Sequence, residues 1–223
     1  MLFTTLLLAG LAAAVPVAVP AKSALPLPEA PFKWHAPAHM GNISFHGTHR
    51  EVIVQIKALN STAWRFNATH RAHLDKTRKA EIDEHLALIK QHGNATSTLE
   101  SRSNRYTQYC FQPQYGTASF DVATDNYLYI YDHFGTGMCE TVPRSCSRFS
   151  CSYDDSIVMC NDEPTPAIIP CATLAQNAAF LTNTCRHFDN KGHAIGNDCE
   201  GQAFYHNPNY NVLVKQVDVG KWC

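Results

Sequence analysis

The sequence predicts an α+β fold: a small, disulfide-rich antiparallel sheet with one helix packed across it, preceded by a poorly ordered proregion that contains a helix. Two observations support this fold class. All nine cysteines lie from Cys110 onward, which is typical of the disulfide framework of a small secreted domain. The segment Ser156–Cys223 also shows a strand pattern, a helix pattern and a hairpin pattern in succession.

The helix is predicted over Cys171–Cys185, where small and apolar residues recur at helical spacing. This stripe consists of Cys171, Leu174, Ala175, Ala178, Leu181 and Cys185. Because the cysteines lie on the same stripe as the leucines, we expect the helix to pack on the sheet with both cysteines in disulfides.

Five strands are predicted around this helix. Ser156–Cys160 is a short apolar run that suits a buried strand, and Gly201–His206 and Tyr210–Val219 flank a proline-containing turn, as in a hairpin. Upstream, Thr117–Ala123 and Tyr127–Tyr131 are expected to form two strands joined by a polar turn. The alternate tyrosines of the last strand form either a platform for a carbohydrate or protein partner, or an ordinary cross-strand ladder.

Composition divides the chain into three parts. Residues 1–18 form an apolar run that is too short to span a bilayer and ends in small residues, so we expect a cleaved signal peptide and a secreted, extracellular product. Residues 1–102 carry 11 basic and 7 acidic side chains, a net charge of +4, and eight of the twelve histidines. Residues 103–223 carry 7 basic and 12 acidic side chains, a net charge of −5. This asymmetry indicates a proregion over 19–102 and a cysteine-rich α+β domain over 103–223.

The predicted proregion contains too little regular structure to form a hydrophobic core of its own. A strand is expected at Glu51–Lys57 and a charged helix at Arg71–Gln91, and together they bury too little surface to stand alone. Four glycosylation sequons also fall here. Their acceptors are Asn42, Asn60, Asn67 and Asn94.

The junction Thr98–Arg102 is polar and ends on a basic residue. It resembles the Leu-Glu-Lys-Arg sites that kexin-type proteases cut in fungal proproteins, with Ser101 in place of the lysine. Arg102 is therefore the predicted processing site, and an ordinary linker is the alternative.

An odd number of cysteines leaves one without a partner inside the chain. That cysteine is either a free thiol or the link of a disulfide-bonded dimer, and the sequence does not determine the pairing. Three of the cysteines are expected in a Ser/Arg-rich loop that disulfides must hold (Cys139, Cys146 and Cys151). The full set is Cys110, Cys139, Cys146, Cys151, Cys160, Cys171, Cys185, Cys199 and Cys223.

The densest polar cluster lies between the predicted helix and hairpin. As a catalytic site it offers His187, Asp189, His193 and Glu200 for acid–base chemistry, whereas the simpler interpretation is a solvated loop. A calcium loop is excluded because Lys191 occupies the third position, and we expect no metal or cofactor.

A secreted ribonuclease would need histidines such as His133, His187 or His206. The acidic charge of residues 103–223 would repel a polyanion, so we expect no nucleic-acid partner.

The run Val158–Asp162, the Cys171–Cys185 helix and the Gly201–Val214 hairpin resemble a pattern in small cysteine-rich secreted fungal proteins. This group includes candidate effectors and killer-toxin-like α/β sandwiches. The resemblance implies a non-enzymatic binder or toxin that acts on a protein, glycan or membrane of another organism. The alternative is a small secreted hydrolase, ribonuclease- or glycosidase-like, that uses the His187–Glu200 loop. A further hypothesis is that the contacts of the proregion with the acidic domain change as its histidines gain charge, so that cleavage at the junction depends on pH between about 5.5 and 7.

Overall fold

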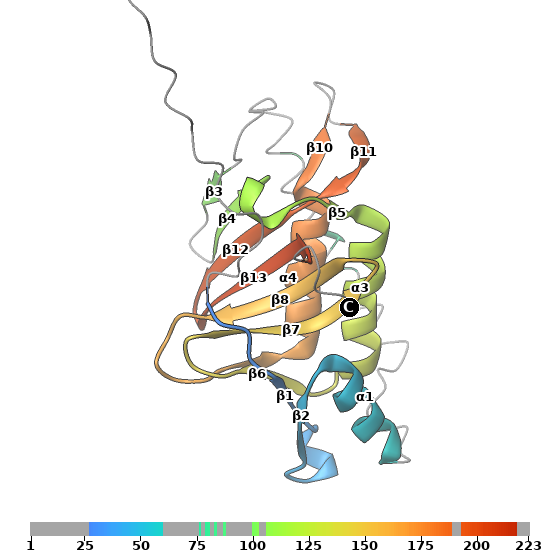
Figure 1. The fold of residues 1–223 in the computed structure, drawn as a ribbon, viewed down its shortest axis with the longest axis vertical. Coiled ribbons are helices and arrows are strands. Elements are labelled where there is room, and N and C mark those ends of the chain that lie inside the picture. Colours follow the sequence, from blue (N-terminus) through green and yellow to red (C-terminus); the bar gives the residue numbers. More distant parts are fainter. Residues whose placement is uncertain are drawn as a thin grey trace, which may run out of the picture.

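A computed structural model describes residues 27–59, 100–102, 106–188 and 193–217, together with Lys76, Lys79, Ala80, Asp83 and Ala87. Two helices lie side by side across one face of a six-stranded antiparallel sheet (Figure 1). The predicted α+β, disulfide-rich class is confirmed. In the part of the chain that is described, no helix is long and apolar enough to cross a membrane.

The six-stranded sheet has the order β3-β4-β12-β13-β8-β7, with every neighbouring pair antiparallel. Its strands are β3 (Glu100–Arg102), β4 (Tyr106–Cys110), β12 (Gly201–His206), β13 (Asn209–Gln216), β8 (Asp155–Asn161) and β7 (Ser145–Ser152). The predicted strand at Ser156–Cys160 and the predicted hairpin are therefore confirmed. In that hairpin, Gly201 pairs with Val214 at one end and His206 with Asn209 at the other.

Helix α4 (Cys171–Thr184) confirms the predicted helix, with Leu174, Ala178 and Leu181 fully buried. It packs on β12, β13 and the neighbouring helix α3 (Phe120–Phe134). Disulfides hold it at both ends, because Cys171 pairs with Cys139 and Cys185 pairs with Cys110.

The remaining described cysteines complete the framework. Cys146 and Cys160 form a disulfide between directly paired positions of β7 and β8, and Cys151 is also disulfide-bonded. Cys199 has a free thiol and is fully buried.

The prediction of two strands over Thr117–Tyr131 is wrong. Only β5 (Ala118–Ser119) is extended, and helix α3 (Phe120–Phe134) follows it. The buried side chains of α3 recur at helical spacing, so tertiary packing overrides the strand propensity of the tyrosines. Tyr127 and Tyr131 lie one turn apart in the core, and the predicted tyrosine platform is therefore wrong as well.

The predicted loop around Cys139, Cys146 and Cys151 is in fact two strands, β6 (Met138–Thr141) and β7. Two of the four serines of β7 are hydrogen-bonded to helix α3. Ser150 and Ser152 both donate to Asn126 Oδ1, at 2.7 and 2.9 Å.

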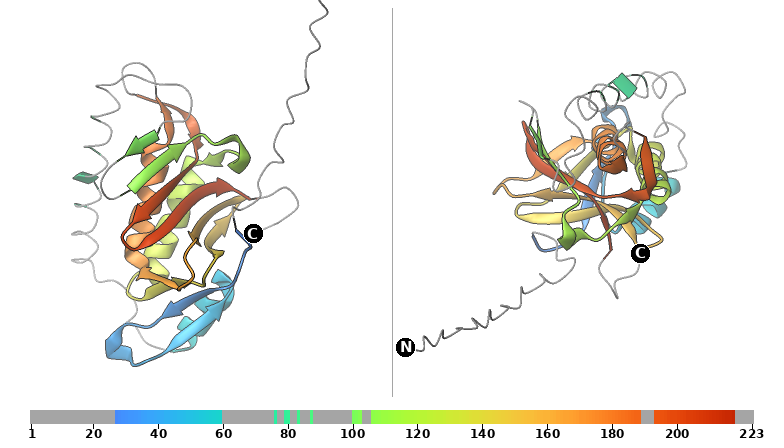
Figure 2. Two further views of the ribbon diagram at one scale, coloured as in Figure 1. Left: turned by 90° about the vertical axis from the view of Figure 1, so that its left-hand side faces the viewer. Right: turned by 90° about the horizontal axis from the view of Figure 1, so that it is seen from above.

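The N-terminal segment 27–59 is also part of the fold (Figure 2). The strand predicted at Glu51–Lys57 is wrong: helix α1 (His49–Ala58) begins with a capping box in which Thr48 and Glu51 satisfy each other's backbone N–H groups. The short helix η1 (Ala38–Met40) lies between β1 (Phe32–His35) and β2 (Ser44–Gly47).

These strands extend a second sheet of order β2-β1-β6-β9, where β9 is Ala167–Pro170. The expectation that order before Ser103 is confined to Glu51–Lys57 and Arg71–Gln91 is therefore wrong. The predicted helix Arg71–Gln91 lies mostly outside the described residues.

A third sheet is formed by β10 (Arg186–Phe188), β11 (Ala194–Cys199) and β5. Its β10–β11 hairpin projects from one end of the molecule (Figure 1). The short helix η2 (Pro113–Tyr115) lies between β4 and β5 in the chain.

Candidate binding groove on the open face of the sheet

Strands β4 and β12 present different residue types to the two faces of the six-stranded sheet. Ala203 belongs to the hydrophobic core under the helices, and Gln108 donates a hydrogen bond to Thr184 of α4. Because side chains alternate along a strand, the neighbours Gln202, Phe204 and Tyr109 point to the opposite face.

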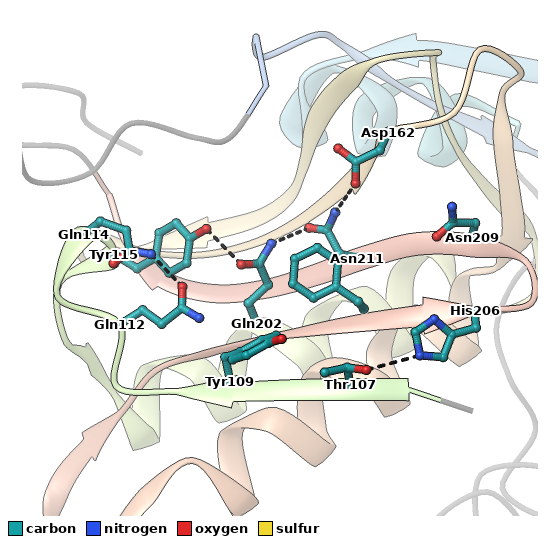
Figure 3. A pocket seen from close by; sticks show the side chains of 11 residues that line it. Thr107, Tyr109, Gln112, Gln114, Tyr115, Asp162, Gln202, His206, Asn209 and Asn211 are labelled. Atoms are coloured by element: carbon teal, nitrogen blue, oxygen red, sulfur yellow. Dashed lines mark hydrogen bonds between the residues drawn. The ribbon is translucent and has the colours of Figure 1, made fainter. Parts of the chain in front are cut away.

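These open-face side chains line a cavity of about 580 Å³ (Figure 3). Residues of helix η2 and Asp162, which directly follows β8, also line it. The lining residues are Thr107, Tyr109, Gln112, Gln114, Tyr115, Asp162, Gln202, Phe204, His206, Asn209 and Asn211. We refer to this cavity as the groove.

A continuous hydrogen-bond chain crosses the floor of the groove. Tyr115 donates from its hydroxyl to Gln202 Oε1 at 2.9 Å, and Gln202 donates from Nε2 to Asn211 Oδ1 at 2.9 Å. Asn211 in turn donates from Nδ2 to Asp162 Oδ2 at 3.0 Å. Tyr115, Gln202 and Asn211 are buried, so each side chain is held in one orientation by its neighbours. Burial also raises the pKa of Tyr115, which keeps its hydroxyl protonated as a donor.

The rim is polar and aromatic. Gln114 Nε2 donates to Gln112 Oε1 at 2.6 Å, and Thr107 Oγ1 lies 3.2 Å from His206 Nε2. Tyr109 and Phe204 are half-buried and meet edge to face, with ring centroids 5.9 Å apart.

The charge of the groove is low and negative. Asp162 is the one carboxylate among its lining residues, and none of them is Lys or Arg. Lys215 is buried and lies 5.9 Å from the Tyr115 ring, outside this lining. The groove is therefore unsuited to an anionic ligand.

The sequence-predicted site residues lie elsewhere, on the β10–β11 hairpin and at its base. His187 is exposed and stacks on Phe111 with 4.1 Å between ring centroids, and His193 is exposed just before β11. Glu200 is buried between β11 and β12, and burial raises its pKa to about 8. Asp189 lies outside the described residues. None of His187, His193 and Glu200 lines the groove.

Other sequence-predicted positions are also placed. Arg102 ends β3 and pairs with Thr107 of β4, and Asn42 is exposed in the connection between β1 and β2. Asn60, Asn67, Asn94 and Cys223 lie outside the described residues. Burial raises the pKa of the Cys199 thiol to about 12, and the described part of the chain offers no accessible thiol for a disulfide-linked dimer.

Sequence reasoning did not find the groove. The signal was present in Gly201–His206, where small and polar or aromatic residues alternate, but the partner strand β4 was not predicted. Without that strand, Gln202 and Phe204 had no neighbours on their face.

Within the described ranges no group of three or more His, Cys, Asp or Glu side chains is arranged to hold a metal ion. Comparison with protein-family models, curated proteins and solved structures gave no match.

Proposed function

We propose that this protein is a secreted, cysteine-rich binder of the effector or toxin-like type, which acts outside the cell without catalysis. Its groove binds a neutral oligosaccharide on the surface of another organism. The observation that carries this proposal is the buried chain from Tyr115 through Gln202 and Asn211 to Asp162, which orders polar groups beneath an open cavity. The disulfide framework is compatible with an extracellular location.

The chemistry of the groove matches sugar hydroxyls. A hydroxyl both donates and accepts hydrogen bonds, and so do the amide, phenol and imidazole groups that line the cavity. Half-buried Tyr109 and Phe204 add aromatic surface against which the apolar side of a sugar ring packs. Sites for small molecules commonly combine such apolar contact with a few fixed polar groups.

The same lining argues against glycoside hydrolysis in the groove. Glycosidases generally use two carboxyl groups that flank the scissile bond. Asp162 is the one carboxylate in the lining, and it already accepts a hydrogen bond from Asn211.

Binding to a panel of neutral and acidic oligosaccharides, measured by titration calorimetry, tests the proposal. We expect neutral oligosaccharides to bind, and Tyr109→Ala to weaken that binding at least tenfold because stacking surface is lost. Tyr153→Ala is the matched control, since Tyr153 is 88% exposed in a turn outside the groove. Failure of every neutral oligosaccharide to bind, an equal effect of both variants, or release of new reducing ends would refute the proposal.

A further inference from the structure

We infer that cleavage after Arg102 does not release the N-terminal segment: residues 27–59 stay bound to residues 106–217 as a second, non-covalently held chain. The product is then a two-chain protein, and the segment is a permanent structural subunit. This inference is independent of the proposed ligand of the groove.

Aromatic side chains of β1 are buried in the core of residues 106–217, which we call the larger part. Phe32 and Trp34 are 1% and 0% exposed. The Phe32 ring lies 5.4 Å from that of Phe134 and 4.4 Å from that of Phe149, and Trp34 Nε1 donates to the Phe134 carbonyl at 3.0 Å. Removal of the segment would open a slot lined by these rings.

The fit around Trp34 is close. A Cβ atom on Gly137, which precedes β6, would collide with the Trp34 indole and with the His35 carbonyl. The turn between α3 and β6 is therefore shaped to the backbone and indole of the N-terminal segment.

Main-chain pairing adds a second set of contacts. Strand β1 pairs with β6 across three residue pairs, from Lys33–Glu140 to His35–Met138. Before β1, Ala30 N donates to the Cys146 carbonyl at 2.8 Å, and Cys146 N donates to the Pro28 carbonyl at 2.9 Å. If the segment left, these donors and acceptors would lose their partners.

Charge pairing supplies a third set. Glu140 is 5% exposed and accepts from Lys33 Nζ at 2.8 Å, while its other oxygen lies 2.6 Å from His35 Nε2. Glu29 pairs with Arg148 at 3.1 Å. Departure of the segment would break both of these pairings of the Glu140 carboxylate.

Helix α1 completes the docked surface. Val52, Ile53 and Ile56 are buried on one side of it, whereas Val54 is 67% exposed. All nine cysteines lie at or after Cys110, so no disulfide can tether the segment after a cut. Retention depends on the non-covalent contacts alone.

The test starts from the secreted full chain treated with a kexin-type protease. Hydrolysis of the Arg102–Ser103 amide consumes one water and leaves a carboxylate on Arg102 and an amine on Ser103. If Arg102 is cut poorly, Ser101→Lys supplies a dibasic site. We expect both fragments in one particle by native mass spectrometry at pH 7, and their separation in denaturant without reductant. Elution of the N-terminal fragment as a separate species at pH 7 would overturn the inference.

A matched pair of variants locates the contact. Val52→Asp should lower the retained fraction at least tenfold after cleavage, and Val54→Asp on the same helix should leave it unchanged. If Val52→Asp is not secreted, Trp34→Phe replaces it, because this variant loses the bond to the Phe134 carbonyl and should speed dissociation. Equal retention in the buried-site and exposed-site variants would count against the inference.

Expression of residues 103–223 alone gives an independent readout. We expect aggregated or misoxidised protein, rescued by co-expression of residues 1–102. A monomer with native disulfides and an unchanged melting temperature would show that the segment is dispensable and would overturn the inference.

Discussion

His35 Nε2 lies 2.6 Å from Glu140 Oε2, which joins a strand near the start of the chain to the strand that carries Cys139. Glu140 also accepts from Lys33, so one buried carboxylate holds two basic side chains of the N-terminal segment. The signs of the charges in this contact match those expected from a basic N-terminal part and an acidic C-terminal part.

Glu140→Gln should destabilise the protein by about 1–3 kcal/mol, because the new amide nitrogen cannot accept from His35. Burial of Glu140 raises its pKa, but bonds from Lys33 and His35 outweigh this effect and hold the pKa below its usual value of 4.5. The stabilisation is therefore present above about pH 4.5 and is lost as pH falls through the lowered pKa. Thermal melting of both proteins from pH 7 to pH 3 measures it. Parallel curves would show that the carboxylate does not contribute in this way.

His49 should make the stability of the protein depend on pH over a higher pH range than Glu140 does. Burial, then the charges of Arg50 and Arg148, lower the pKa of His49 from 6.5 to about 4. Its ring also lies edge-on to Tyr129, with centroids 6.3 Å apart. Between pH 4 and 6.5 the unfolded chain binds more protons, so stability is complete above pH 6.5 and falls as pH drops toward 4.

His49→Gln should flatten that part of the profile of unfolding free energy against pH. The same slope in both proteins would exclude His49 as its source. Because His49 contacts Tyr129 of α3, this comparison also bears on the predicted dependence of docking on histidine charge.

Leu181→Asp should abolish secretion of folded protein. Leu181 is fully buried at the end of α4, and an unpaired buried charge costs several kcal/mol, a large share of the stability of a small domain. Gln176→Asp on the same helix is the control, since Gln176 is only half-buried. Normal secretion of both variants, measured by immunoblot of the medium, would refute the importance of this packing.

Cys199 should resist alkylation in the native state. Its thiol is fully buried, and burial raises its pKa to about 12, so little reactive thiolate is present at pH 8. We expect Cys199 to be alkylated in denaturant without reductant and to stay unmodified without denaturant. Rapid native labelling at Cys199, or a dimer on a non-reducing gel that Cys199→Ser removes, would contradict the buried placement.

Local patterns predicted the C-terminal part of the fold well. The stripe from Cys171 to Cys185 and the hairpin after Cys199 depend on short-range periodicity, and both were correct. The same reasoning failed at Tyr127 and Tyr131, where residues that favour strands lie at a spacing that fits a helix. It also failed at Val52–Ile56, where β-branched residues favoured a strand although the segment forms a helix that begins at the Thr48–Glu51 capping box.

Long-range contacts account for the rest. Trp34 is buried against Phe134, a residue 100 positions away, and no local sequence pattern predicts that contact. The groove likewise combines side chains from β4, η2, β12 and β13 with Asp162, which follows β8, so its polar floor exists only once the sheet is assembled. A polar residue such as Gln202 is indistinguishable from a surface residue until its neighbours are known.

The two disulfides of α4 connect the helix to different sheets, through Cys110 of β4 at one end and Cys139 of β6 at the other. Most helices fray at their termini, so their end amides exchange with solvent much faster than their central ones. Here both ends are fastened to separate sheets, and unwinding cannot begin at either end without distorting a sheet. Among the amides of α4 that bond within the helix, hydrogen exchange should therefore be nearly uniform, with those near the ends opening together with those at the centre of the helix.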